Sequence, residues 1–95
     1  MNDQRKEEAI ALINAELEYH RNEYRKAGID MDPLADVIVR AEEDHVVFIY
    51  DGAGNDYFSH NSELTMPRDR LFTALDEAGF DIEDRNNWSS AVREA

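Results

Sequence analysis

The sequence predicts one small α+β domain over residues 1–95, with a long N-terminal helix, a three-stranded antiparallel meander and one or two C-terminal helices. Three observations predict this order. An apolar stripe with helical spacing comes first, three short segments of β-type composition follow it, and a second helical stripe comes after them. A chain of 95 residues has the length of one domain and can bury one modest core.

The first helix is predicted over residues 3–27. Apolar side chains recur there at spacings that place them on one helix face, namely Ile10, Ile13, Leu17 and Tyr24. His20 falls in the same stripe. Gly28 follows, and glycine readily adopts the positive φ at which many helices end.

Three strands are predicted next, over residues 35–41, 45–50 and 56–60. Pro33, in the connector before them, prevents the helix from resuming. The first strand alternates apolar and polar side chains, which suits an edge. The second is apolar on both faces and therefore belongs in the middle of the sheet. The turns at 42–44 and 51–55 have hairpin lengths, so a meander with the second strand at its centre is expected.

A second helix is predicted from about Pro67 to Ala78, because proline is favoured in a first helical turn. Thr65 or Met66 would cap it, and Gly79 would end it. Its apolar face would consist of Leu71, Phe72, Leu75 and Ala78. In the last segment, 81–95, a further helical turn or two is expected to dock on the core through Trp88, Ala91 and Val92.

The charge of the chain is large and unevenly distributed. Twenty-two acidic residues oppose ten basic ones, which gives a net charge of −12. Residues 1–26, 27–67 and 68–95 carry −1, −8 and −3, so two thirds of the charge lies in the middle segment. Such a chain is a poor direct ligand for nucleic acid and for anionic membranes, because their phosphates repel it. We expect its partners to be basic protein surfaces, including those of proteins that bind nucleic acid.

The acids of the predicted hairpins form the candidate site. Glu42, Glu43 and Asp44, called here the acidic turn, are consecutive, and Asp51 and Asp56 flank the next turn. Like charges held close together require solvent or a cationic partner. Aromatic side chains nearby would anchor such a partner, with Tyr50, Tyr57 and Trp88 as candidates. The predicted partner-binding residues are therefore Glu42, Glu43, Asp44, Asp51, Asp56 and Tyr57.

Catalytic and metal chemistry find little support in the sequence. The spacing of the three histidines is generic, so we expect His20 to line the helix stripe, and His45 and His60 to end strands. Residues 51–56 lack the acids of a calcium loop, the serines lack a nucleophile motif, and there is no cysteine. We predict no metal, no cofactor and no enzyme activity. No apolar run approaches the length of a membrane span and no signal peptide is visible, so a cytoplasmic location is expected.

Two functional hypotheses remain open. In the first, the chain is an inhibitor or regulator that occupies a basic, nucleic-acid-binding surface of another protein. In size and charge it resembles phage-encoded inhibitors of bacterial defence, anti-CRISPR proteins among them, DNA mimics and immunity proteins of nuclease toxins. In the second, it is a structural or regulatory domain that dimerises through the first helix and is acidic for solubility. An enzyme or metal protein using His45 and His60 ranks last.

Overall fold

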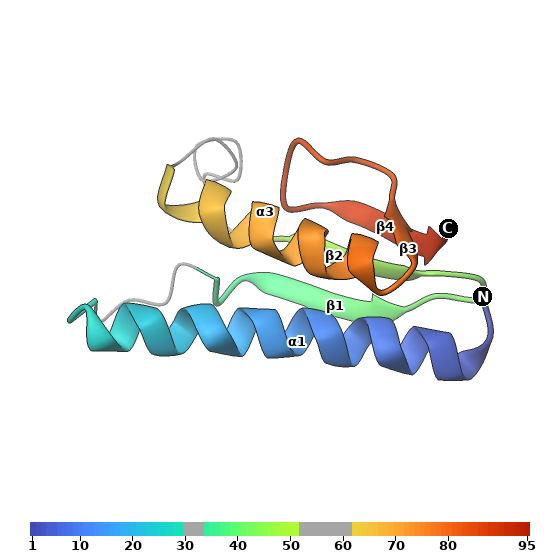
Figure 1. Cartoon of the computed structure of the whole chain (residues 1–95), viewed down its shortest axis with the longest axis horizontal. Coiled ribbons are helices and arrows are strands. Elements are labelled where there is room, and N and C mark those ends of the chain that lie inside the picture. Colours follow the sequence, from blue (N-terminus) through green and yellow to red (C-terminus); the bar gives the residue numbers. More distant parts are fainter. Residues whose placement is uncertain (30–33, 52–61) are drawn as a thin grey trace.

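Two helices pack against one face of a four-stranded antiparallel sheet (Figure 1). The structure, a computed structural model, describes residues 1–29, 34–51 and 62–95, with side chains from residue 66 onward in the last range. Its elements are α1 (Asp3–Lys26), β1 (Val37–Ala41), β2 (Val46–Tyr50), α3 (Ser62–Glu77), β3 (Phe80–Ile82) and β4 (Ser90–Glu94). The strand order is β1-β2-β4-β3. The predicted α+β class is therefore confirmed, but the sheet has four strands instead of three.

Helix α1 confirms the first predicted helix to within one residue at its end. The Asn2 side chain caps it by accepting a hydrogen bond from the Arg5 backbone N–H at 2.8 Å. After the helix, Gly28 has a φ of 80°, as expected for a residue that ends a helix. The face buried against the rest of the chain consists of Ala9, Ile13, Leu17 and His20. The predicted stripe is therefore the packing face of this helix.

Strand β2 lies inside the sheet, between β1 and β4, as its apolar composition predicts. Val46, Phe48 and Tyr50 are buried beneath the helices, whereas Val47 and Ile49 on the other face are half-buried. β1 pairs with β2 in a hairpin, with Val39 opposite Phe48, and forms one edge of the sheet. The first two predicted strands are therefore confirmed.

The third predicted strand, 56–60, lies outside the described residues, as do most of the 51–55 turn and Pro33. The position beside β2 on the side away from β1 belongs to β4. The prediction of a further C-terminal helix in residues 81–95 is wrong, because β3 and β4 form an antiparallel pair there. Val92 of β4 lies opposite Val46 of β2 on one side and opposite Ile82 of β3 on the other. All three side chains are buried, and burial of Val92 between these two neighbours explains why the segment forms a strand.

The second helix begins earlier than predicted. α3 starts at Ser62, so Pro67 lies inside it and neither Thr65 nor Met66 is the cap. Proline keeps a helical φ and lacks one N–H donor, so the helix continues through it at the loss of one hydrogen bond. The helix ends at Glu77, and Gly79 follows with a φ of 86°, as predicted for its end.

The core lies between the helices and the sheet and is centred on three aromatic rings. Phe48 of β2 lies 6.0 Å from Phe72 of α3 and 6.2 Å from Trp88, measured between ring centroids. All three are almost inaccessible to solvent. Trp88 and Val92 therefore dock on the core as predicted, although Trp88 lies in the loop before β4 and Val92 lies in β4, and neither is helical.

Candidate functional site

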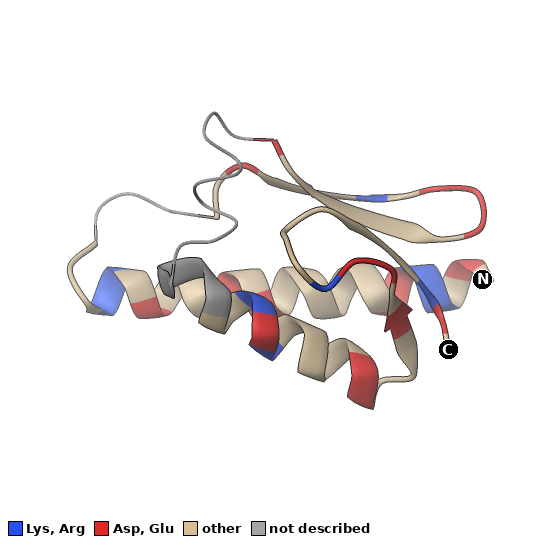
Figure 2. Ribbon diagram, turned by 90° about the horizontal axis from the view of Figure 1, so that it is seen from above, with Lys and Arg blue, Asp and Glu red and all other residues tan. Residues whose placement is uncertain are grey.

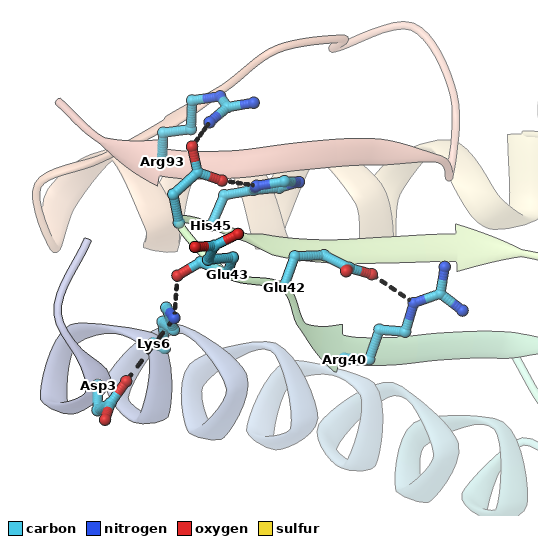
Figure 3. Close-up of polar contacts among 8 residues, drawn as sticks. Asp3, Lys6, Arg40, Glu42, Glu43, His45 and Arg93 are labelled. Atoms are coloured by element: carbon cyan, nitrogen blue, oxygen red, sulfur yellow. Dashed lines mark hydrogen bonds and ion pairs between the residues drawn. The ribbon is translucent and has the colours of Figure 1, made fainter.

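The acidic turn lies at the end of the β1–β2 hairpin, close to the N-terminus of α1 (Figure 3). Its charges meet cations of the same chain. Nε of Arg40 pairs with Oε1 of Glu42 at 2.7 Å. Lys6 donates a hydrogen bond to the backbone carbonyl of Glu43, and its Nζ lies 3.7 Å from Oδ1 of Asp3.

Asp44 is the most strongly engaged of the three acids. Nδ1 of His45 donates to its Oδ1 at 2.6 Å, and Nη1 of Arg93 lies 3.5 Å from its Oδ2. The hydrogen bond from His45 and the charges of His45 and Arg93 hold the pKa of Asp44 below its ordinary value. Glu42 and Asp44 thus have cationic neighbours already, whereas the exposed Glu43 carboxylate has none among the described residues.

A second group of acids lies at the opposite end of the hairpin (Figure 2). The backbone N–H of Asp51 donates to the carbonyl of Asp36 at 3.0 Å, so these two residues are neighbours. Both are exposed, and neither forms an ion pair within residues 1–29, 34–51 and 62–95. Burial and the Asp36 carboxylate raise the pKa of the adjacent Tyr50 hydroxyl. This Asp36–Asp51 pair is therefore the uncompensated acidic end of the sheet.

The structure separates the predicted partner-binding residues into two places. The acidic turn and Asp51 lie at opposite ends of the five-residue strand β2, which spans about 17 Å. Asp56 and Tyr57, and also His60, lie outside the described residues. The candidate anchors Tyr50 and Trp88 are 3% and 1% exposed, so they are core residues and are not available to a partner.

The stripe on α1 that would support a homodimer is used within the chain. Ile13 and Leu17 are buried against the sheet and α3, and Ile10 and Tyr24 pack at the margin of the same core. A dimer through this stripe would have to open the core. Ile13 and Leu17 are therefore not exposed for a dimer contact, and the homodimer itself stays a prediction.

A groove runs between the C-terminal half of α1 and the N-terminal half of α3. It has a volume of about 520 Å³ and is lined by Tyr19, His20, Glu23, Tyr24, Met66, Pro67 and Arg70. Most of this lining is apolar. Tyr19 and Met66 are two of the four large apolar side chains that stay exposed in the described part of the chain.

One wall of the groove is a connected set of side chains from both helices. Nε of Arg70 donates to Oε2 of Glu16 at 2.8 Å, and its guanidinium carbon lies 3.9 Å from the centroid of the Tyr19 ring. The Tyr19 ring in turn meets the His20 ring edge-on at 5.0 Å. The hydrogen bond from Arg70 to Glu16 raises the pKa of this guanidinium further, so it stays charged.

His20 is the one buried titratable side chain in this region, at 7% exposure. Its Nε2 has no hydrogen-bond partner among the described residues and lies 3.8 Å from Oε2 of Glu16, beyond hydrogen-bond distance. Burial lowers the pKa of His20, with a smaller raising effect from Glu16 and a further lowering effect from Arg70. The ring is therefore neutral at neutral pH.

The described ranges contain no group of three histidine, cysteine, aspartate or glutamate side chains placed to hold a metal ion. His20 lies on α1 beneath the groove and His45 lies at the acidic turn, so these two do not meet. In the same ranges, none of the helices is long and apolar enough to span a membrane.

Sequence reasoning did not single out Tyr19, Met66 and Arg70. Tyr19 lies off the apolar stripe of α1. This position could have indicated an exposed aromatic side chain, because a large ring outside the buried face of a helix lies at the margin of the core or in solvent. Met66 was predicted only as a possible helix cap, because α3 begins earlier than predicted, and no sequence pattern set Arg70 apart from the other residues of its helix.

Comparison of the chain with protein-family models, with curated proteins and with solved structures gives no match. The function is therefore argued from the surface alone.

Proposed function

We propose that this protein is a small acidic protein-binding protein, an inhibitor or regulator that occupies a basic, nucleic-acid-binding surface of another protein. The observation that carries the proposal is the Asp36–Asp51 pair. These two exposed residues are joined by a backbone hydrogen bond on a chain of net charge −12, and their carboxylates lack a cationic partner in the described part of it. A cationic surface would remove their repulsion and would be attracted from a distance.

The acidic turn and the Asp36–Asp51 pair have different parts in this proposal. At the acidic turn, Glu42 and Asp44 would have to exchange their own cations for those of a partner, so little electrostatic energy would be gained there. The Asp36–Asp51 pair has no such contact to break. The predicted residues Asp56 and Tyr57 lie outside the described residues, so their part in binding stays a prediction from the sequence.

The mode of action follows from charge. Acids that take the place of phosphates on a basic groove compete with the nucleic acid that the groove normally binds. Phage-encoded inhibitors of bacterial defence, anti-CRISPR proteins and DNA mimics would act in this way, and the chain resembles them in size and charge. Because exposed charge pairs weaken as salt screens them, the complex should form readily at low ionic strength and poorly at high ionic strength.

The test is capture of partners by the immobilised protein from a nuclease-treated bacterial lysate, at low salt and at about 0.5 M salt. Three double variants are compared with the wild type, namely Asp36→Lys/Asp51→Lys, Glu42→Lys/Asp44→Lys and Glu7→Lys/Glu77→Lys. Each reversal adds two charges, so all three have a net charge of −8 instead of −12. Differences among them therefore report position and not total charge.

The expected result is a basic partner that is retained at low salt, released at high salt and lost only in the Asp36→Lys/Asp51→Lys variant. Equal loss in all three variants would indicate attraction by total charge without a defined surface. Retention of every partner by the Asp36→Lys/Asp51→Lys variant, or recovery of no basic partner at low salt, would overturn the proposal. It would leave the second hypothesis, in which acidity serves solubility.

A further inference from the structure

The groove between α1 and α3 has the dimensions and lining of a binding site. Its volume of about 520 Å³ lies within the range of about 300–1,000 Å³ that ligand pockets occupy. Tyr19 comes from α1, and Met66 and Pro67 come from α3, so both helices supply apolar walls. Tyrosine, methionine and arginine are enriched where proteins bind one another. The composition of the groove therefore favours a polypeptide ligand.

Two of the four large apolar side chains that are exposed among the described residues lie at the groove. Tyr19 is 42% exposed and Met66 is 75% exposed, although each is large enough to contribute to a core. Ile38, on the open face of the sheet, is 44% exposed but does not line this groove. Apolar side chains that gather at a hollow mark an interaction site more often than apolar side chains that are scattered singly.

The polar wall of the groove is held in place before any ligand arrives. Arg70 is fixed by its ion pair with Glu16 and by its stacking on the Tyr19 ring, and that ring is supported by His20. Half-exposed arginine and tyrosine side chains normally lose rotamer freedom when they bind a ligand. Here most of that freedom is already lost, which favours binding.

The charges around the groove select the polar group of the ligand. Arg70 uses Nε for Glu16, and its two Nη nitrogens have no acceptor in the described part of the chain, so the groove offers donors. Its positive charge is already balanced by Glu16, and Glu23 lines the same groove. A carboxylate or phosphate would meet Glu23 and the net charge of −12, whereas a neutral carbonyl accepts from Nη without this repulsion.

We propose that this groove binds a large apolar side chain of a partner polypeptide, with the neutral backbone carbonyl beside it accepting a hydrogen bond from Arg70. The inference goes beyond the acidic surface, because it assigns a second site that is formed by the two helices instead of the hairpin. It would supply the apolar anchor that Tyr50 and Trp88, both buried, do not provide.

The test uses three small probes in place of the partner and follows backbone amide shifts of the full chain by NMR. N-acetylphenylalaninamide carries the apolar body and neutral carbonyls, N-acetylphenylalanine carries the same body with a carboxylate, and N-acetylalaninamide lacks the apolar body. Matched variants are Tyr19→Ala in the groove and Ile38→Ala on the sheet, which remove side chains of similar exposure. The dispersion of the remaining signals reports whether each variant is folded.

The expected result is saturable binding of N-acetylphenylalaninamide with a dissociation constant of about 1 mM and shifts confined to residues 19–24 and 66–70. N-acetylphenylalaninamide should bind about two- to fivefold more tightly than N-acetylphenylalanine, because an exposed charge interaction changes an affinity by about this factor. N-acetylalaninamide should not bind. Binding should be lost in folded Tyr19→Ala and kept in Ile38→Ala.

Three results would overturn the inference. They are the absence of saturable shifts at the groove, equal binding by folded Tyr19→Ala, and binding of the carboxylate that is as tight as that of the amide or tighter, which would show that the groove does not favour a neutral ligand. None of them involves the captured partner. Failure of the probe experiment therefore leaves the proposed acidic surface untouched, and failure of the capture experiment leaves the groove untouched.

Discussion

Asp44, on the turn between β1 and β2, forms an ion pair with Arg93 of β4, with Oδ2 and Nη1 3.5 Å apart. The two residues are distant in the sequence, and only the pairing of β4 with β2 brings them together. A segment that is strongly acidic as a sequence is thus partly neutralised in the fold. The surface charge of this protein therefore depends on its sheet order, and not on the run of acids alone.

The first prediction concerns the titration of Asp44. His45→Leu removes the hydrogen bond that is the main cause of its lowered pKa, so this pKa should rise toward its ordinary value of 3.8. Carbon-detected NMR titration of the carboxyl groups measures it. Asp76 is the internal control, since its pKa is lowered by Arg85 instead and should not move.

The lowered pKa of Asp44 also determines how the stability of the fold changes with pH. A carboxyl whose pKa is lowered on folding supports the native state above its ordinary pKa, and this support is lost as pH falls through the folded value. His45→Leu should therefore show a shallower loss of stability than the wild type at acidic pH below about 4. An unchanged Asp44 titration in the variant would show that the hydrogen bond from His45 is not the cause.

The second prediction concerns the aromatic core. Phe48 is inaccessible to solvent and contacts both Phe72 and Trp88, so Phe48→Ala leaves a cavity among rings that cannot collapse fully. It should cost about 3–5 kcal/mol, a large part of the stability of a small domain. Urea denaturation measures the loss. Ile38→Ala, on the exposed face of the neighbouring strand, should cost about 1 kcal/mol or less.

Local patterns were sufficient to predict α1 and β2. The stripe on α1 extends over many turns, and five successive apolar residues in β2 leave no polar face to expose. Both signals are contained in the segment that forms the element. The physical cause of each element, burial of its own apolar face, is therefore visible without knowledge of the rest of the fold.

Strand β4 could not be predicted in the same way. Its residues Ser90–Glu94 include one large apolar side chain, Val92, and alanine, arginine and glutamate favour helices. The strand forms because Val92 fits between Val46 and Ile82, which only the assembled sheet provides. Phe80-Asp81-Ile82 does alternate, but three residues are too few for a clear period.

The candidate sites depend even more on tertiary structure. The acids of the predicted site are visible in the sequence, but Arg93, which pairs with Asp44, and Lys6, which bonds the Glu43 backbone carbonyl, come from distant segments. The groove exists only because α1 and α3 cross, which places Tyr19 beside Arg70. A sequence lists possible partners of a side chain, and the fold selects among them.

The third prediction compares the two glycines with positive φ. Gly28 and Gly79 have φ of 80° and 86°, so alanine at either position should cost about 1–2 kcal/mol through backbone strain. At Gly79 a new Cβ would also lie 3.3 Å from Nη2 of Arg5, whereas Gly28 faces open space. That Arg5 group donates to the Ala78 carbonyl at 2.9 Å and would have to shift.

Gly79→Ala should therefore be more destabilising than Gly28→Ala in parallel thermal unfolding experiments. The comparison controls for the cost of backbone strain, since both glycines have nearly the same φ. Equal losses would mean that Arg5 moves aside freely and that its contact with the end of α3 contributes little.

The fourth prediction concerns His20, which is buried beneath the groove and whose Nε2 has no hydrogen-bond partner among the described residues. Burial lowers its folded pKa below the ordinary value of 6.5, so the unfolded chain binds a proton at a pH at which the folded chain does not. Stability should then fall as pH drops below about 6.5 and continue to fall until the folded pKa is reached. Above that window His20 should have no effect on the pH dependence.

His20→Leu keeps an apolar side chain of similar bulk in the stripe and removes the titration. The part of the stability loss between about pH 7 and 5 that belongs to His20 should disappear in this variant and persist in His45→Leu. Urea denaturation at several pH values measures the difference between each variant and the wild type, which cancels the contribution of the carboxyl groups. The charges that face His20 are Glu16 and Glu23 from α1 and Arg70 from α3. If the wild type and His20→Leu have parallel pH profiles, these acids compensate its burial and the proposed sign is wrong.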